Sequence, residues 1–226
     1  MKISVIIPIK NEPLINELIK EVHRNLIDYK HEIIIIDKSD KKPNIIDAEF
    51  FSQKSDGLGN AVIEGFGYAN GDVIITMDGD FSHNPKDLTR FVKKIKEGYD
   101  IVIGSRYVQG GSIKNWNPYR KITSKSANML SSFLLGVNVN DITSNYRCYR
   151  KYVLNSIGLN KIKSGGYAFI QEILYLSKLD GFKIAEIPIV FVDREYGKSK
   201  LTKKEMYKFF IELLKLKLRN SFSLKK

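Results

Sequence analysis

Two aspartates, Asp78 and Asp80, stand on either side of Gly79, directly after the apolar residues 73–75. Two unpaired carboxylates this close together repel each other, whereas a hard divalent cation such as Mg²⁺ or Mn²⁺ binds both. Glycine has no Cβ, so it makes the required turn easy. Because Mg²⁺ usually completes its shell with substrate phosphates and water, the pair predicts a bound diphosphate as well as a metal. Asp-Gly-Asp is also a common solvated turn, and that alternative stays open.

The elements that must position these acids alternate between strand and helix. Apolar runs predict strands at 3–7, 32–37, near 47–52, 72–77 and 100–104, and helical spacing predicts helices at 14–26, 59–69 and 85–97. Pro8 is expected to stop the first strand, and Asn11 to cap the helix that follows. This alternation predicts an α/β fold with a doubly wound, mostly parallel sheet and right-handed crossovers.

The second half of the chain is less regular. Its pattern predicts helices at 121–135, 152–157 and 169–179, strands at 146–149 and 184–192, and a basic helical segment from Thr202 onward. No internal repeat or linker separates these segments. With 226 residues, the chain suits one domain. We divide it into a catalytic unit, residues 1–201, and a basic amphipathic C-terminal helix and tail, residues 202–226.

Ligands of an open parallel sheet bind beyond the carboxyl ends of its strands. Four segments converge on that edge: residues 8–12, Asp37, the acid pair and residues 104–106. Basic residues near glycine, serine and tyrosine could hold two anions there, although each taken singly is a solvated surface charge: Lys10, Lys54, Arg106, Arg120, Arg147, Arg194 and Lys200.

The net charge of +12 favours a polyanionic partner: nucleic acid, an acidic membrane surface or a phosphate-bearing small molecule. A lysine-rich surface that serves solubility is the alternative. No nucleic-acid-binding module is recognisable, so we expect no nucleic acid. The lone Cys148 excludes an internal disulfide and a Cys-based zinc site, and fits a reducing compartment. No apolar stretch approaches the roughly 18 to 20 residues of a membrane span, so any work at a membrane is expected on its surface.

The three histidines show no metal-binding spacing. His23 and His31 are expected at the surface, whereas His83 could position the loop after the acid pair or touch substrate. Signatures of a nucleophile elbow, a P-loop and a dinucleotide-binding turn are missing, which removes support for hydrolase, kinase and dehydrogenase functions.

Several segments together resemble one enzyme family. They occur in this order: SVIIPIKNE, EIIIID, GLGNAVIEGFGYANGDVIITMDGDFSHNP, DIVIGSRY, RKITSKSANML, DITSNYRCYRKYVL, GGYAFIQEILY and EIPIVFVDREYGKSKL. The chain resembles the dolichyl-phosphate mannose synthases and other polyprenyl-phosphate glycosyltransferases of the family 2 inverting glycosyltransferases. The likeness covers residues 2 to 205, and DREYGKSK is its most specific segment. It implies a single GT-A type, Rossmann-like domain and transfer of a hexose, mannose foremost, from a nucleotide sugar to dolichyl or polyprenyl phosphate.

The resemblance implies a nucleotide site at the ends of the first two strands. Pro8, Glu12 and Ile36 would contact the nucleotide, and the side chains of Lys10 and Lys38 would lie near the base. These lysines replace side chains that read the base in the family. The donor, GDP-mannose or a UDP-hexose such as UDP-glucose, therefore stays open.

The resemblance also implies the metal and phosphate ligands. Asp78, Gly79 and Asp80 would hold the donor and Mg²⁺ or Mn²⁺, with Asp80 the firmest metal ligand. The phosphates of donor or acceptor would be bound by Arg106, Arg194 and Lys200, and the lipid phosphate by Arg120 and Ser124. Asp80 and Arg106 are the predicted catalytic residues. Two further departures from the family are Ser82, where some relatives have a better metal ligand, and Asn145, where glycine is common.

A phosphate monoester acceptor is already anionic at pH 7, because its second pKa is about 6. It needs little help from a general base, so we expect a single inverting displacement driven by positioning and charge stabilisation.

The C-terminal segment carries an apolar stripe amid basic residues, which suits an interfacial helix on an anionic membrane. The stripe comprises Met206, Phe209, Phe210, Leu213 and Leu214. Packing on the core or on a partner subunit is the alternative. We expect a peripheral position on the cytoplasmic face of a membrane, with a membrane-anchoring subunit as a further candidate partner. A transferase that acts on a soluble glycan or protein, and a catalytically silent nucleotide-binding subunit, stay open as other functions.

Overall fold

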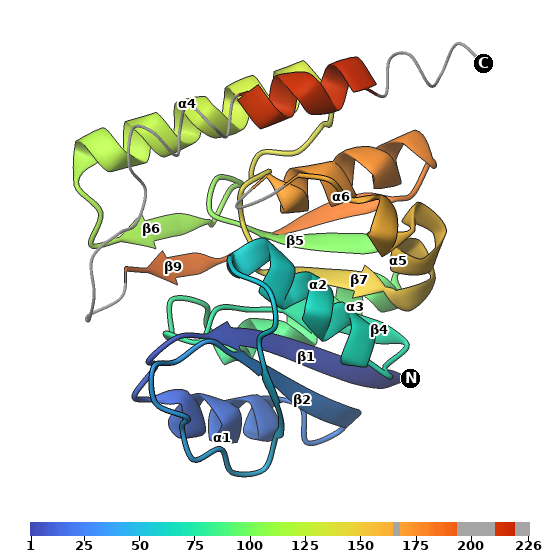
Figure 1. Cartoon of the computed structure of the whole chain (residues 1–226). Helices are drawn as coiled ribbons and strands as arrows, with labels where there is room; N and C mark the ends of the chain where they lie inside the picture. Colours follow the sequence, from blue (N-terminus) through green and yellow to red (C-terminus); the bar gives the residue numbers. More distant parts are fainter. Residues whose placement is uncertain (165–167, 194–210, 220–226) are drawn as a thin grey trace.

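A seven-stranded sheet runs through the described part of the chain, in the order β3-β2-β1-β4-β7-β5-β8 (Figure 1). The computed structural model describes residues 1–164, 168–193 and 211–219. The strands are β1 (Lys2–Ile9), β2 (Lys30–Asp37), β3 (Glu49–Ser52), β4 (Val73–Thr76), β5 (Ile101–Ser105), β7 (Arg147–Arg150) and β8 (Ile184–Pro188). Only the pairings of β7 in this sheet are antiparallel, so the predicted doubly wound, mostly parallel sheet is confirmed.

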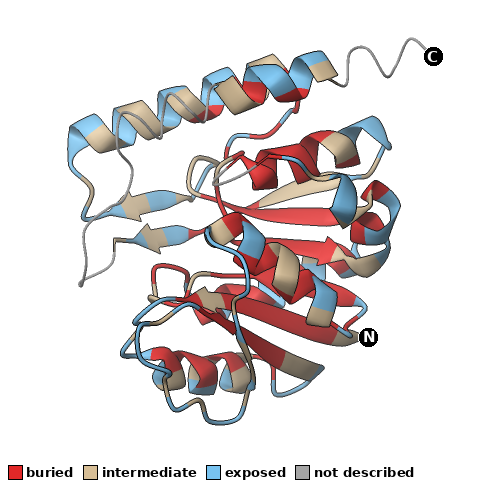
Figure 2. Ribbon diagram, viewed as in Figure 1, coloured by how far each residue is buried: buried red, intermediate tan, exposed pale blue. Residues whose placement is uncertain are grey.

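Helices cover both faces of this sheet, which is why its strands are apolar on both sides. Along β2, Ile33 and Ile35 join one core cluster, whereas Ile34 and Ile36 join the other. Figure 2 shows the resulting band of buried central strands. The helices are α1 (Ile15–Asn25), α2 (Leu58–Tyr68), η1 (Pro85–Asp87), α3 (Leu88–Lys96), α4 (Pro118–Leu135), α5 (Lys151–Ile157), η2 (Leu159–Lys161) and α6 (Phe169–Leu179).

The expectation that Pro8 ends the first strand is wrong, because β1 continues to Ile9. The pairing of β1 with β4 ends at Ile6 and Thr76, and Lys38 donates to the Ile9 carbonyl on the β2 side. Since alternate residues of a strand present their backbone groups to opposite neighbours, Pro8 faces the side where β4 has already ended. Its missing N–H therefore costs no ladder hydrogen bond.

The expectation that Asn11 caps the first helix is also wrong. That helix starts after Leu14, and Asn11 has a positive φ of 58°. Its backbone N–H donates to Ser39 Oγ and its side-chain amide to Asp40, at 2.7 and 2.8 Å. Asn11 therefore joins the loop after β1 to the loop after β2, which are the loops expected to surround a nucleotide.

The single strand expected at 184–192 is two strands, β8 and β9 (Val190–Val192). At the break, Ile189 donates to the Ser105 carbonyl and accepts from the N–H of Ser112. The chain thereby leaves the large sheet, and β9 pairs with β6 (Ser112–Lys114), which the sequence pattern missed. Continuous apolar residues concealed this change of partner.

Helix α4 begins one turn earlier than predicted, since Asn117 caps it by accepting from the N–H of Arg120 at 2.8 Å. Residues 211–219 form a further helix, which lies against the C-terminal part of α4 (Figure 1). There Leu213 is fully buried in the core, whereas Leu214 is half-exposed. At Leu213 the stripe thus packs on the core; Met206, Phe209 and Phe210 lie outside the described residues. Among the described helices, none is both long and apolar enough to span a membrane.

Candidate active site

The acid pair lies directly beyond β4, at the carboxyl edge of the sheet. Gly79 between the acids has no positive φ, so the turn itself does not require glycine. The reason is proximity: a Cβ at this position would stand 2.7 Å from Ile9 Cγ2 and 3.3 Å from Ile7 Cγ2. Glycine lets the acid loop lie against the end of β1, next to Glu12. The expected explanation, an easier turn, is therefore replaced by a close approach.

The Asp78 carboxylate is held by neighbours on two sides. Its Oδ1 accepts from Asn145 Nδ2 at 3.0 Å, and its Oδ2 lies 3.7 Å from His83 Nε2. The backbone N–H of Asp78 donates to His83 Nδ1 at 3.0 Å, so that nitrogen carries no proton. Burial lowers the pKa of His83 more than the nearby acids raise it, and the ring is neutral with its proton on Nε2. His83 positions the acid loop, one of the two roles expected for it.

Asp80 is organised by its own loop. Its Oδ1 accepts from the backbone N–H of Ser82 at 3.1 Å and from Ser82 Oγ at 2.5 Å. Ser82 is buried, and Phe81 between them takes a positive φ of 60°. Ser82 thus fixes one oxygen of Asp80.

The two acids suit a hard divalent cation, since both are partly exposed carboxylates on one short loop. Among the described residues, no group of three or more His, Cys, Asp or Glu side chains could hold a metal. A magnesium ion held by one or two carboxylates usually completes its shell with substrate phosphates and water.

The predicted nucleotide residues lie beside this loop, at the ends of β1 and β2. Pro8 and Ile36 are register partners, half-buried and buried respectively. Lys10 is exposed, and Lys38 forms an ion pair with the exposed Asp56 at 3.1 Å. The Asp37 carboxylate accepts from Ser39, so it shapes its own loop.

Arg106 follows β5 and is almost fully buried. Its Nε and Nη2 each donate to the Asp141 carboxylate at 2.7 Å, and Nη2 also donates to Thr143 Oγ1 at 2.8 Å. Burial alone would lower the pKa of Arg106, but the charge and hydrogen bonds of Asp141, together with the nearby Tyr107 and Asp78, outweigh it and raise the pKa. The guanidinium is therefore a fixed positive charge.

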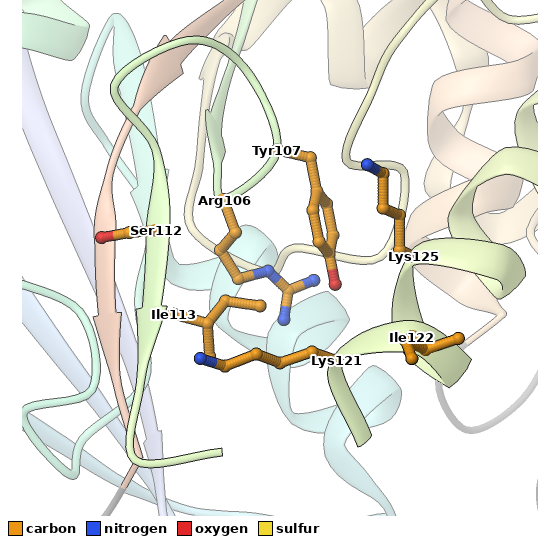
Figure 3. A pocket seen from close by; sticks show the side chains of 7 residues that line it. All are labelled: Arg106, Tyr107, Ser112, Ile113, Lys121, Ile122 and Lys125. Atoms are coloured by element: carbon orange, nitrogen blue, oxygen red, sulfur yellow. The ribbon is translucent and has the colours of Figure 1, made fainter. Parts of the chain in front are cut away.

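An open pocket of about 310 Å³ lies against Arg106, between β6 and the first turns of α4. Figure 3 shows the guanidinium between Ile113 and Tyr107, with Lys121 and Lys125 on the helix. The remaining lining residues are Ser112 and Ile122. Basic groups beside apolar walls suit an anion attached to an apolar chain.

The predicted acceptor residues flank this pocket, one helical turn apart on α4. Ser124 Oγ accepts from Tyr107 OH at 2.7 Å. Arg120 forms an ion pair with Asp193 at 2.7 Å and stacks on Trp116, with 3.9 Å from its guanidinium carbon to the ring centroid. Both are held in place by residues outside α4.

Two of the other predicted cations, Arg147 and Lys54, do not join the site. Arg147 is fully buried and donates to the carbonyls of Ser144, Ile170 and Ile142, so its expected phosphate role is wrong. Lys54 is exposed on the loop after β3. Arg194 and Lys200 lie outside the described residues, as does most of DREYGKSK. His23 and His31 are half-buried, and their rings are joined by a hydrogen bond of 2.7 Å.

The loop formed by residues 141–145 is the part of the site that the sequence pattern missed. It lies beyond β4 and β5 because β7, which follows it, runs antiparallel. Asp141 binds Arg106 at one end, and Asn145 binds Asp78 at the other. One short loop therefore joins the acid pair to the basic pocket.

A doubly wound sheet with an acid pair at its carboxyl edge is the arrangement of a GT-A type glycosyltransferase. The chain belongs to glycosyl transferase family 2, whose family model matches residues 4–158.

Two curated relatives carry more specific names. The polyprenol monophosphomannose synthase of Mycolicibacterium smegmatis is 43% identical over 152 residues, which are 65% of this chain and 56% of that protein. The dolichol-phosphate mannosyltransferase of Pyrococcus furiosus is 35% identical over 229 residues, 96% of this chain and 64% of that protein. The chain thus spans less than two thirds of either relative.

Solved structures of glucosyl-3-phosphoglycerate synthase from Mycobacterium tuberculosis share the fold. The complex with Mn²⁺, UDP and phosphoglyceric acid has a TM-score of 0.69 at 19% identity, covering 96% of this chain and 78% of that one. The complex with Mg²⁺ and UDP has a TM-score of 0.70 at 18% identity, covering 95% and 79%. At this identity the likeness establishes the fold alone.

Proposed function

We propose that this chain transfers a hexose, mannose foremost, from a nucleotide sugar to a polyprenyl phosphate such as dolichyl phosphate. One observation carries the proposal: residues 141–145 join an acid pair to a basic, apolar-walled pocket, through Asn145 to Asp78 and Asp141 to Arg106. A sugar diphosphate with its cation suits the first part, and a lipid phosphate suits the second. The names of the two curated relatives support this pairing of substrates.

In this proposal Asp78 and Asp80 hold Mg²⁺ or Mn²⁺ together with the donor. When bound, such a cation neutralises the charge that develops on the leaving diphosphate. The two carboxylates attract the cation, and Ser82, Asn145 and His83 keep them in place. Pro8, Lys10, Glu12, Ile36 and Lys38 are the proposed nucleotide contacts, and Arg194 and Lys200 remain proposed phosphate ligands.

The nucleophile is the acceptor phosphate itself. An oxygen of this monoester attacks the anomeric carbon as the bond to the nucleoside diphosphate breaks, which inverts the configuration. No proton has to be removed, because the monoester is already ionised near pH 7. The Nδ1 of His83, the nitrogen without a proton, already accepts from the Asp78 N–H, which fits this absence of a general base. Arg106, Arg120 and Ser124 mask and orient the acceptor charge, so that catalysis rests on positioning.

The acceptor lipid implies work at a membrane surface, and the outer face of α4 supports this. Tyr119, Ile122, Met129 and Phe133 recur at helical spacing there and are between 66% and 81% exposed. Lys121 and Lys125 flank them, which favours an anionic lipid surface. Sedimentation with liposomes, with and without anionic lipid, tests this; no binding to either would exclude the membrane position.

The transfer itself is tested with labelled nucleotide sugars, Mn²⁺ or Mg²⁺, and a polyprenyl phosphate, followed by extraction into organic solvent. We expect labelled lipid from the wild type and none from Asp80→Ala, with the fold unchanged. Asp28→Ala, an exposed acid after α1, is the matched control. Near-normal transfer by Asp80→Ala would contradict the metal role, and a purely water-soluble product would contradict the lipid acceptor.

The donor is identified by thermal shift, since a ligand that binds only the folded state stabilises it by mass action. The panel contains GDP-mannose, UDP-glucose and other nucleotide sugars with either cation. Lys10→Ala and Lys38→Ala should weaken the response to the true donor, if these lysines lie against its base.

A further inference from the structure

Asn145 occupies a position between the central strand and the acid pair. Its backbone carbonyl accepts from Thr76 Oγ1 at 2.5 Å, and its side-chain Nδ2 donates to Asp78 Oδ1 at 3.0 Å. The residue is 8% exposed. Both its backbone and its side chain are therefore tied to the end of β4 and the acid that follows.

The orientation of this amide follows from its partner. A carboxylate only accepts hydrogen bonds, so Nδ2 faces Asp78 and Oδ1 points away. That Oδ1 is buried and has no hydrogen-bond partner within the described ranges. A buried carbonyl without a partner lowers stability, so packing alone does not explain an asparagine here. The bond to Asp78 is what this side chain contributes.

Asn145 and His83 contact different atoms of Asp78. His83 fixes the Asp78 backbone N–H, and its Nε2 lies near Oδ2. Asn145 alone among these groups bonds Oδ1. A neutral amide can donate a hydrogen bond to an anionic oxygen without adding positive charge. A lysine at this position would add a positive charge, which would repel a bound cation.

We propose that Asn145 is a positioning residue, which fixes the Asp78 carboxylate for the metal-bound diphosphate donor. The inference rests on the proposed function, because it needs a cation and a diphosphate at the acid pair. Residues that orient a metal ligand through a hydrogen bond typically contribute about 10-fold to 100-fold in metal affinity or activity.

The test measures Mn²⁺ binding by electron paramagnetic resonance in the presence of GDP or UDP, alongside urea unfolding. Asn145→Leu keeps the branched shape and the number of side-chain heavy atoms while removing the donor, and Asn145→Ala removes both the shape and the donor. Asn140 is the matched control, because its Nδ2 also donates to a carboxylate, that of Glu186, at 2.9 Å. We expect the two Asn145 variants to bind Mn²⁺ about 10-fold to 100-fold more weakly, with unfolding midpoints at or above that of the wild type. Asn140→Ala should bind as the wild type does.

A merely structural Asn145 gives the opposite pattern: the midpoints fall while Mn²⁺ binding stays unchanged. That result, with normal binding by the wild type, would overturn this inference and leave the proposed function standing. Failure of the wild-type chain to bind Mn²⁺ with either nucleotide would overturn the proposed function, and this inference with it.

Discussion

The ion pair between Arg106 and Asp141 should be essential to stability as well as to the site. Asp141 is fully buried, and its carboxylate accepts from Arg106 Nε, Nη2 and backbone N–H at 2.7, 2.7 and 2.9 Å. Asp141→Asn replaces one accepting oxygen with a donor, which then faces other donors. It also leaves the Arg106 charge buried without a counter-charge.

Removing one partner of a buried ion pair typically costs about 3–5 kcal/mol of unfolding free energy. We expect about 3 kcal/mol, the lower end, because an asparagine oxygen in the place of Oδ2 can still accept two of the three bonds. For a chain of this size that corresponds to a fall in Tm of roughly 6–12 °C. Transfer should be lost too, since Arg106 loses the group that orients it.

Urea unfolding measures this difference, with Glu21→Gln as the control. Glu21 pairs with Arg24, whose side chain is 75% exposed, so breaking that pair should cost under about 0.5 kcal/mol. Burial alone would raise the pKa of Asp141, but the charge and hydrogen bonds of Arg106 hold the pKa below its usual value. The stabilisation is therefore complete above the unfolded pKa of about 3.9 and is lost as the pH falls through the folded pKa. A loss under about 1 kcal/mol at pH 7, or a difference that grows towards pH 3, would refute the reasoning.

Three further changes test other features. Gly79→Ala should lower the unfolding free energy by about 1–3 kcal/mol and reduce transfer, since the new methyl group would stand 2.7 Å from Ile9 Cγ2. Adding Ile9→Ala to this variant removes the clash and should restore part of the transfer. No recovery in the double variant would contradict the close-approach explanation. Burial raises the pKa of the Cys148 thiol, so a thiol reagent should label it only on unfolding; rapid labelling of the native protein at pH 8 would count against this. Phe133→Asp, at a residue 81% exposed, should leave the unfolding midpoint unchanged and weaken binding to anionic vesicles; equal binding would remove α4 from the membrane contact.

Most of the sheet could be predicted because both of its faces are buried. Short, continuous runs of β-branched residues such as 33–36, flanked by Glu32 and Asp37, favour buried strands. The prediction failed where tertiary pairing decides the outcome. Pro8 stays within β1 only because β4 has ended beside it, and the break at Ile189 depends on the edge of a second sheet. Neither fact is a local property of the sequence.

The acid pair could be found because it directly follows a buried strand, at the edge of the sheet where ligands of such folds bind. The partners of the pair could not. Asp141 lies 35 residues from Arg106, and Asn145 lies 67 residues from Asp78. The residues of each pair come into contact only because β7 enters the sheet antiparallel, between β4 and β5. The role of Arg147 was mispredicted for the same reason. Its charge suggests a phosphate ligand, whereas the fold buries its side chain.

Arg147 gives the loop 141–145 its rigidity. A buried guanidinium with carbonyl partners holds the backbone at Ile142 and Ser144 and ties it to α6 through Ile170. The same loop carries Asn145 and Asp141, which contact Asp78 and Arg106, so one anchored loop joins the two groups. A displacement without a general base gains its rate from the fixed placement of nucleophile and leaving group. The inward-facing arginine, which binds no substrate in this scheme, therefore anchors the loop that joins the two halves of the proposed site.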